Sequence, residues 1–245
     1  MNESKDLFTG PVVVIGAKPN AVFPALAAPV VITANAAVEL GVHYRERFGS
    51  RLVAVASSGD LLKRPDMQEA LRKSRPEDLV LLGDHIGAPE QFVKHTLELG
   101  DTVVTVISFC ELQRLIKEAL GWRVLFLMVR CLWARGVKSF IKHDVPDLLT
   151  HRTYTWMSRS TGLNAILYAL KRFPHAKEIV VAGVGLQAGG HSTGTLTFAE
   201  KTARVDRTTF SLWPRARRPR VYTTDEVMSK VGKVSLWEGE TFHIT

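Results

Sequence analysis

Short runs of β-branched and aliphatic residues recur along the chain, and longer segments with apolar residues at helical spacing separate them. An apolar run bounded by turn signals is typical of a strand buried on both faces, as in a parallel sheet. The predicted strands cover 11–15, 30–34, 52–56, 80–83, 102–107, 179–182, 220–222 and 235–237. Their alternation with helical segments predicts an α/β fold with a doubly wound, mainly parallel sheet and flanking helices, which is a Rossmann-like architecture.

The segments between these strands contain the predicted helices. Apolar spacing and helix breakers place helices at 36–48, 61–75, 89–99 and 198–212. A further helix opens at residues 159–162 and ends before Pro174. We interpret 21–26 as a short helical or irregular piece and 189–191 as a glycine-rich turn that carries a histidine. No repeat, low-complexity tract or linker divides the chain, so we predict a single domain over 1–245.

The composition is that of a globular protein in a reducing compartment. The 245 residues are 46% hydrophobic and 23% charged, which suits a sizeable buried core. The two cysteines, Cys110 and Cys131, provide neither a disulfide framework nor metal-ligand spacing. The polar start of the chain and the absence of a membrane-length apolar run lead us to expect a cytoplasmic protein. The net charge of +8 favours nucleotides, nucleic acid or an anionic membrane surface as partners, without choosing among them.

Small and polar residues follow three of the predicted strands, at the end where ligands bind in open α/β sheets. Gly16 and Pro19 lie in the turn after the first strand, whereas Asn35 and Ser57 end the second and third. The amide of Asn35 can both donate and accept hydrogen bonds, which suits a ribose or a pyrimidine edge. The dinucleotide fingerprint is absent, because the first turn has one glycine where three are needed. A tight-turn glycine and a turn-forming asparagine are the structural alternatives.

The predicted helix start at Arg159, Ser160, Thr161 and Gly162 combines a cation, two hydroxyls and a glycine. The free N–H groups and the macrodipole at a helix N-terminus attract anions, so this segment is a candidate phosphate site. An ordinary capped helix has residues of the same kinds, and both interpretations stay open.

Two segments of the chain are strongly basic. Residues 121–142 combine arginine and lysine with tryptophan and phenylalanine, and we predict that they form an amphipathic helical insertion. This insertion is too short and too basic to span a bilayer, so it is either a buried helix or helix pair with a charged rim, or an element of the membrane interface. Residues 213–220 place four arginines around two prolines. They indicate either a solvated loop or a site for a phosphate, an acidic glycan or an anionic lipid head.

The order of these motifs resembles that of the sialyltransferase-like glycosyltransferases of bacteria, which use CMP-activated acidic sugars such as sialic acid or Kdo. The similarity covers most of the chain through short motifs. In that family a Gly-x-x-Pro-Ser turn and an asparagine after the second strand hold the CMP, and a Ser/Thr-Gly helix start lies at the phosphate. The resemblance implies donor-nucleotide contacts by matching residues, with Ser57 as the weaker match: Gly16, Pro19, Asn35, Ser57, Ser160, Thr161 and Gly162. Arg159, beside the helix start, would add a positive charge for the leaving phosphate.

The chain departs from the family pattern at the position of the expected base. Such enzymes have a histidine a few residues before the aspartate that Asp206 matches, and here Lys201, Thr202 and Ala203 occupy these positions. His191 is the nearest alternative, because a free histidine titrates near pH 6.5 and can take a proton from an acceptor hydroxyl. We therefore predict His191 and Asp206 as catalytic residues, with an ordinary surface-loop histidine as the alternative for His191.

These features predict an inverting glycosyltransferase that transfers Kdo or sialic acid from a CMP-sugar to a glycan or lipid-linked glycan of the cell surface. We expect it in the cytoplasm or on the inner face of the cytoplasmic membrane. No metal or other cofactor is expected, since CMP leaves with a single phosphate and the chain has neither an Asp-x-Asp pair nor a His/Cys cluster.

Two alternatives stay open at this stage. One is a non-catalytic nucleotide- or nucleic-acid-binding α/β protein. We expect no specific nucleic acid, because aromatic residues are not interleaved with basic residues on the predicted strands. The other is an NAD-dependent enzyme, against which the missing glycine fingerprint weighs.

Overall fold

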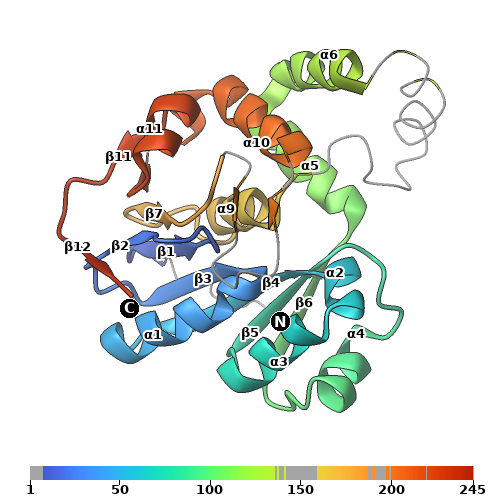
Figure 1. Ribbon diagram of the computed structural model, residues 1–245, viewed down its shortest axis with the longest axis vertical. Helices are drawn as coiled ribbons and strands as arrows, with labels where there is room; N and C mark the ends of the chain where they lie inside the picture. The colour runs from blue at the N-terminus through green and yellow to red at the C-terminus, as the bar shows by residue number, and fades with distance from the viewer. Residues whose placement is uncertain are drawn as a thin grey trace.

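A parallel β-sheet forms the centre of the molecule (Figure 1). The computed structural model describes residues 8–135, 137, 141, 159–186, 189–190, 197–198, 200–218 and 220–244. The eight strands of the sheet are, in spatial order, β11 (Ser235–Leu236), β10 (Val221–Thr223), β7 (Ile179–Ala182), β1 (Val12–Ile15), β3 (Val30–Ala34), β4 (Arg51–Ser57), β5 (Asp78–Leu82) and β6 (Val103–Ile107). Neighbouring strands are parallel throughout. The predicted doubly wound, parallel α/β fold is therefore confirmed.

The strand order reverses at β1. β3 pairs with one side of β1, and β7, from much later in the chain, pairs with the other side. All four residues of β1 have no exposed surface, as expected for an unbroken apolar run in the middle of a sheet. The carboxyl end of β1 is consequently the topological switch point, beside which ligands bind in open α/β sheets.

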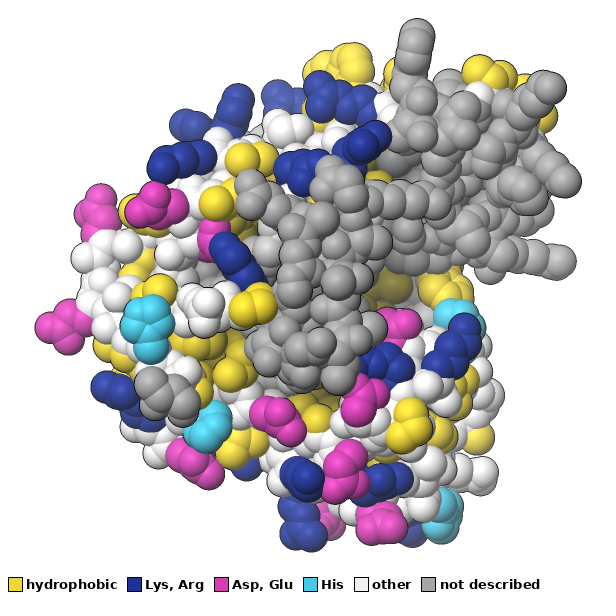
Figure 2. Space-filling model, viewed as in Figure 1, with side chains coloured by type: hydrophobic (Ala, Val, Ile, Leu, Met, Phe, Trp, Pro, Cys, Tyr) yellow, Lys and Arg dark blue, Asp and Glu magenta, His cyan; other side chains and the backbone are white. Residues whose placement is uncertain are grey.

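Helices cover both faces of the sheet, because alternate strand residues point to opposite faces and both sets are apolar. Val13 and Ile15 belong to the core on the face covered by α1 (Val38–Phe48), α2 (Ser58–Lys63) and α3 (Pro65–Ser74). Val12 and Val14 belong to the core on the other face, with α5 (Phe109–Leu120), α6 (Val124–Arg135), α9 (Thr161–Arg172), α10 (Glu200–Leu212) and α11 (Glu226–Gly232). Figure 1 shows these two helix layers on opposite sides of the sheet, and charged side chains are distributed over the outer surface in Figure 2.

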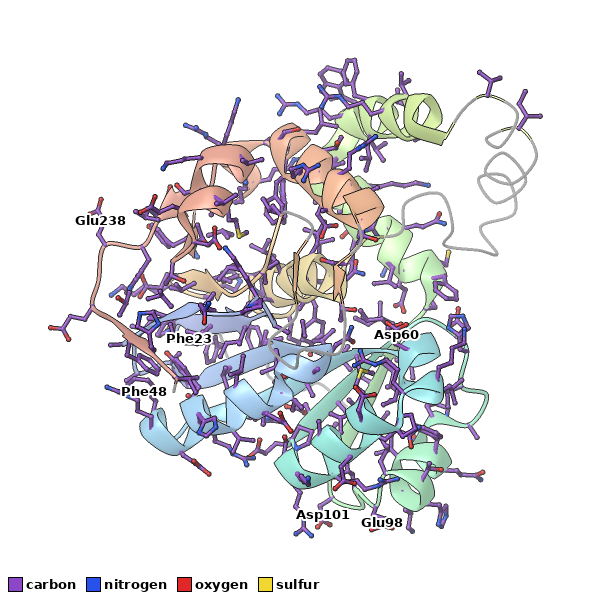
Figure 3. All side chains as sticks on the ribbon, viewed as in Figure 1. Phe23, Phe48, Asp60, Glu98, Asp101 and Glu238 are labelled. Carbon is purple, nitrogen blue, oxygen red and sulfur yellow. The ribbon has the colours of Figure 1, made fainter. Side chains whose placement is uncertain are left out.

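The expectation of a helical or irregular piece at 21–26 is wrong, because part of this segment forms strand β2 (Val22–Pro24). β2 pairs antiparallel with β12 (Thr241–His243), from near the other end of the chain. The buried Phe23 has its ring centroid 5.9 Å from that of Phe242, which also packs against Phe48 of α1. Phe23 and Phe48 lie on the same side of the molecule in Figure 3. The aromatic contacts hold the loop after β1 on the α1 face.

Two predicted helices on this face are interrupted. Pro65 divides the expected helix at 61–75 into α2 and α3, because proline lacks an N–H group and disfavours helical backbone at Arg64. The expected helix at 89–99 is replaced by α4 (Pro89–Gln91) and a π-helical turn, η2 (Phe92–Thr96).

The region around the predicted glycine-rich turn also differs from expectation. Gly189 and Gly190 form strand β8 (Gly189–Gly190), which pairs antiparallel with β9 (Thr197–Phe198). Because Phe198 belongs to β9, the helix expected at 198–212 begins at Glu200 instead. The predicted insertion at 121–142 begins with η3 (Gly121–Arg123) and α6, and the rest of it lies largely outside the described residues.

Candidate functional site

The carboxyl ends of all strands of the large sheet lie along one edge, since the strands are parallel. Gly16, Asn35 and Ser57 follow or end β1, β3 and β4 at this edge. α9 packs on the face of the sheet behind them, and its first residue, Thr161, contacts Asn35. The structure thus brings together residues from four elements that the sequence singled out separately. Figure 3 shows Asp60, after β4, at the opposite end of the strands from Glu98 and Asp101.

The side-chain amide of Asn35 joins three elements of this edge. Its Nδ2 donates to Thr161 Oγ1 at 2.9 Å, and its Oδ1 accepts from the N–H of Ser57 at 3.1 Å. Asn35 also has a left-handed backbone, with φ of 50°, which asparagine tolerates better than most residues. The left-handed backbone supports the turn-forming alternative for Asn35, and contact of its amide with a nucleotide stays a prediction.

The start of α9 has two backbone N–H groups that form no hydrogen bond with the described residues. Ser160 is the N-cap, because its hydroxyl accepts from the N–H of Leu163 at 3.0 Å. No hydrogen bond within the described part of the chain uses the N–H groups of Thr161 or Gly162. A Cβ at Gly162 would lie 3.0 Å from a methyl group of Val184, after β7, so glycine permits this helix to approach β7 closely. Two free N–H groups and the helix dipole make this start suitable for an anion.

Asp206, on α10, lies next to the N-cap and has no exposed surface. Its Oδ1 accepts from the N–H of Ser160 at 3.1 Å, and its Oδ2 has no hydrogen-bond partner among the described residues. Burial raises the pKa of this carboxyl to about 7, although the hydroxyl and N–H of Ser160 and the charge of Arg159 favour ionisation. The contact with Ser160 places Asp206 beside the helix start, and its catalytic role stays a prediction.

Arg159 is buried and is held by other parts of the same helix layer. Its Nε donates to Asn164 Oδ1 at 3.3 Å, and its Nη2 donates to the carbonyl oxygen of Leu112, on α5, at 3.1 Å. The guanidinium thus fixes α9 against α5. Its positive charge still acts on Asp206, so it contributes to the potential at the helix start.

Gly16 has a packing reason to be glycine. A Cβ at Gly16 would lie 2.4 Å from the carbonyl oxygen of Gly183, after β7, and a Cβ at Gly183 would lie 2.6 Å from the carbonyl oxygen of Gly16. The N–H of Gly16 is already bonded to Ala182 and that of Lys18 to Gly183. A nucleotide at this turn would consequently use other groups, such as the surface of Pro19 or the Lys18 ammonium, which forms an ion pair with Asp225.

A histidine that the sequence analysis passed over lies further along the same edge. His85, after β5, has its Nδ1 3.0 Å from Ser58 Oγ, and Ser58 donates its own proton to the carbonyl oxygen of Leu82 at 2.9 Å. Ser58 then accepts from His85 Nδ1, so a neutral imidazole would have its proton on Nδ1 and its lone pair on Nε2. The rule that selected Asn35, a polar residue just after a buried strand, would also have indicated His85.

The hydroxyl of Ser57 and the side chain of His191 were also predicted as site groups. Ser57 is the N-cap of α2, and its hydroxyl accepts from the N–H of Asp60 at 3.4 Å. His191 lies outside the described residues. Within the described ranges, no three His, Cys, Asp or Glu side chains are grouped as metal ligands.

No family model, no curated protein and no solved structure matches the chain. The fold defines the class, a doubly wound, Rossmann-like α/β protein in which the start of α9 contacts the carboxyl edge of the sheet.

Proposed function

We propose that this protein is an inverting glycosyltransferase that uses a CMP-activated acidic sugar, Kdo or sialic acid, as donor. The observation that carries the proposal is the hydrogen-bond chain from Ser57 through Asn35 to Thr161, which joins the ends of β3 and β4 to the start of α9. A CMP-sugar requires groups for a pyrimidine and ribose next to groups for one phosphate. The amide of Asn35 suits the first requirement, and the free N–H groups of α9 suit the second.

Besides donor binding, the transfer reaction requires a base and groups that stabilise the leaving phosphate. In the transfer step, an acceptor hydroxyl oxygen forms a bond to the anomeric carbon, and the bond from that carbon to the phosphate oxygen of CMP breaks. The phosphate takes the bonding electrons, and a base takes the hydroxyl proton. Donors at the helix start stabilise the charge on the leaving phosphate. Metal-independent transfer to a glycan or lipid-linked glycan is part of this proposal.

Donor use is the first test. We expect the full chain to release CMP from CMP-Kdo or CMP-sialic acid in EDTA, as measured by chromatography. CMP at 100 times its Kd should stabilise the fold by about 2.7 kcal/mol in thermal unfolding, with no comparable effect of UMP or NAD. If neither donor binds or reacts, the proposal fails. Salt-dependent binding of an oligonucleotide with no response to CMP would favour the non-catalytic nucleic-acid-binding alternative.

The base is tested separately with two histidine variants. We expect His191→Ala to reduce kcat for transfer by roughly 100- to 10,000-fold, the usual contribution of a general base, while leaving CMP affinity unchanged. His85→Ala is the matched control and should retain transfer. The reverse result, with activity lost only in His85→Ala, would assign the base to the free Nε2 of His85.

A further inference from the structure

The outer face of η3 and α6 exposes large apolar side chains. Trp122 and Leu125 are 69% and 60% exposed, and Phe126 and Val129 are each 47% exposed. Their spacing of three and four residues places them on one side of the helix, and the rings of Trp122 and Phe126 are 5.3 Å apart. Leu127 has no exposed surface and anchors the opposite side of α6 in the core. The helix thus exposes an apolar stripe on one side and buries Leu127 on the other.

The net positive charge of the chain is concentrated in two segments of the sequence, one of which contains this stripe. Residues 119–143 and 207–224 together contain ten of the 32 Lys and Arg and none of the 24 Asp and Glu. The rest of the chain therefore has 22 basic and 24 acidic residues, so these two segments account for the whole excess of +8. These two segments therefore favour anionic contacts, whereas the rest of the chain is close to neutral.

Described residues of the two segments lie side by side at η3 and the end of α10. Arg123 Nη1 donates to the carbonyl oxygen of Leu212, at the end of α10, at 3.2 Å. Arg217 donates to the carbonyl oxygen of Glu118, and its guanidinium lies about 3.2 Å from the place a Cβ would occupy at Gly121. The carboxylate of Glu118 is already near Arg114 and Lys171, at 3.6 and 3.9 Å. Figure 2 shows dark blue side chains next to yellow ones in the region of α6 and α10.

We infer that this face, formed by η3, α6 and the adjacent arginines, docks on an anionic lipid bilayer. Trp122, Leu125 and Phe126 would enter the boundary between head groups and acyl chains, while arginines such as Arg130 and Arg215 contact lipid phosphates. No helix in the described part of the chain has the length and apolar character to cross a bilayer, so the contact is with the membrane surface.

A bilayer accounts for both properties of the face. A nucleic acid would neutralise the arginines but leave the apolar stripe in water. A second copy would cover the stripe but bring two groups of arginines together. An anionic membrane satisfies the charge and the apolar surface at once. The inference is independent of the proposed donor, since none of these residues belongs to the carboxyl edge of the sheet.

Vesicle binding tests the inference directly. We expect the full chain to co-sediment at least tenfold better with phosphatidylcholine vesicles containing 30% phosphatidylglycerol than with phosphatidylcholine alone, and to dissociate as salt rises. The double variant L125Q/F126Q should lose at least tenfold in binding. Leu62→Gln, which changes a similarly exposed leucine on α2, is the matched control and should bind as the unchanged protein does.

Charge and apolar contact should contribute to vesicle binding separately. The charge variant R130Q/R215Q should weaken binding to anionic vesicles while the apolar stripe is intact. Bromine-labelled lipids should quench tryptophan emission, and Trp122→Phe should remove most of that quenching. Equal binding to both vesicle types, or full binding by L125Q/F126Q, would overturn the inference. A dimer that L125Q/F126Q dissociates, without vesicle binding by the unchanged protein, would assign the face to a second copy and also overturn it.

Discussion

Replacing Asp206 with asparagine should remove a large pH-dependent part of the stability. The folded protein retains a proton on Asp206 up to a pKa of about 7, whereas the unfolded chain releases it near 3.8. The folded state therefore binds more protons between these values, and the free energy of unfolding falls as pH rises through the interval. A shift of about three units corresponds to roughly 4 kcal/mol, as an upper bound for this buried group.

The measurement is a comparison of two proteins across pH. Urea unfolding at several pH values from 4 to 8 gives the stability difference between Asp206→Asn and the unchanged protein. This difference should move in favour of the asparagine variant as pH rises, and any constant cost of the new amide group cancels. Asp66→Asn is the control with a flat profile, because Arg64 lowers the pKa of Asp66 and this carboxyl is then ionised in both the folded and the unfolded state over most of this pH range. Parallel stability curves for Asp206→Asn would show that the carboxyl titrates alike in both states.

Asn35→Asp should reduce CMP affinity by about 10- to 100-fold, the largest effect that we expect on donor binding. The aspartate retains the acceptor for the N–H of Ser57 and tolerates the left-handed backbone. It loses the donor to Thr161 and adds a negative charge beside the phosphate site. A lost hydrogen bond costs about 1 kcal/mol, and repulsion between like charges at an effective dielectric of about 20 adds a similar or larger amount.

Thr161→Val separates these two causes, since it removes the same hydrogen bond without adding charge. It should weaken CMP binding by about tenfold or less. Raising the salt concentration should reduce the defect of Asn35→Asp and leave that of Thr161→Val nearly unchanged. Normal CMP affinity in Asn35→Asp would place the nucleotide elsewhere on the protein.

The sheet was predictable because its strands consist of unbroken apolar residues. Val12 to Ile15 and Ile179 to Ala182 have no alternating polar face, and only burial on both sides of a sheet suits such runs. The order of the strands could not be predicted, because no sequence feature of β1 or β7 indicates that these two strands pair. The pairing of β2 with β12 could not be predicted for the same reason. Phe23 contacts Phe242 only in the folded chain, and the residues around Phe23 do not indicate this contact.

The sequence contains local signals for two features that the prediction missed, helix α5 and the break between α2 and α3. α5 was not among the predicted helices, yet Ser108 and Glu111 form a capping box with bonds of 3.2 and 3.1 Å. The Ser-x-x-Glu spacing and the apolar residues that follow it indicate this helix. Pro65 likewise marks the break between α2 and α3.

The candidate site was predictable in its members but not in its contacts. Asn35, Ser57 and Thr161 were selected as polar residues at strand ends and at a helix start, and the structure joins them through one amide. The surroundings of Arg159 and Asp206 were harder to anticipate, because both side chains are buried beside the start of α9. Sequence reveals that a residue is charged, but the pKa of Asp206 depends on elements that surround it only in the folded chain.

The position of β1 has a consequence for synthesis of the protein. One edge of β1 pairs with β3 soon after both are made, but the other edge is covered only by β7, which begins at Ile179. At the usual rate of ~5–20 residues per second, the intervening chain takes on the order of ten to thirty seconds to make. During that time Val12 to Ile15 are an unpaired apolar edge, the kind of strand that joins other chains most readily. The strand at the centre of the finished sheet is thus an unprotected edge of the growing chain.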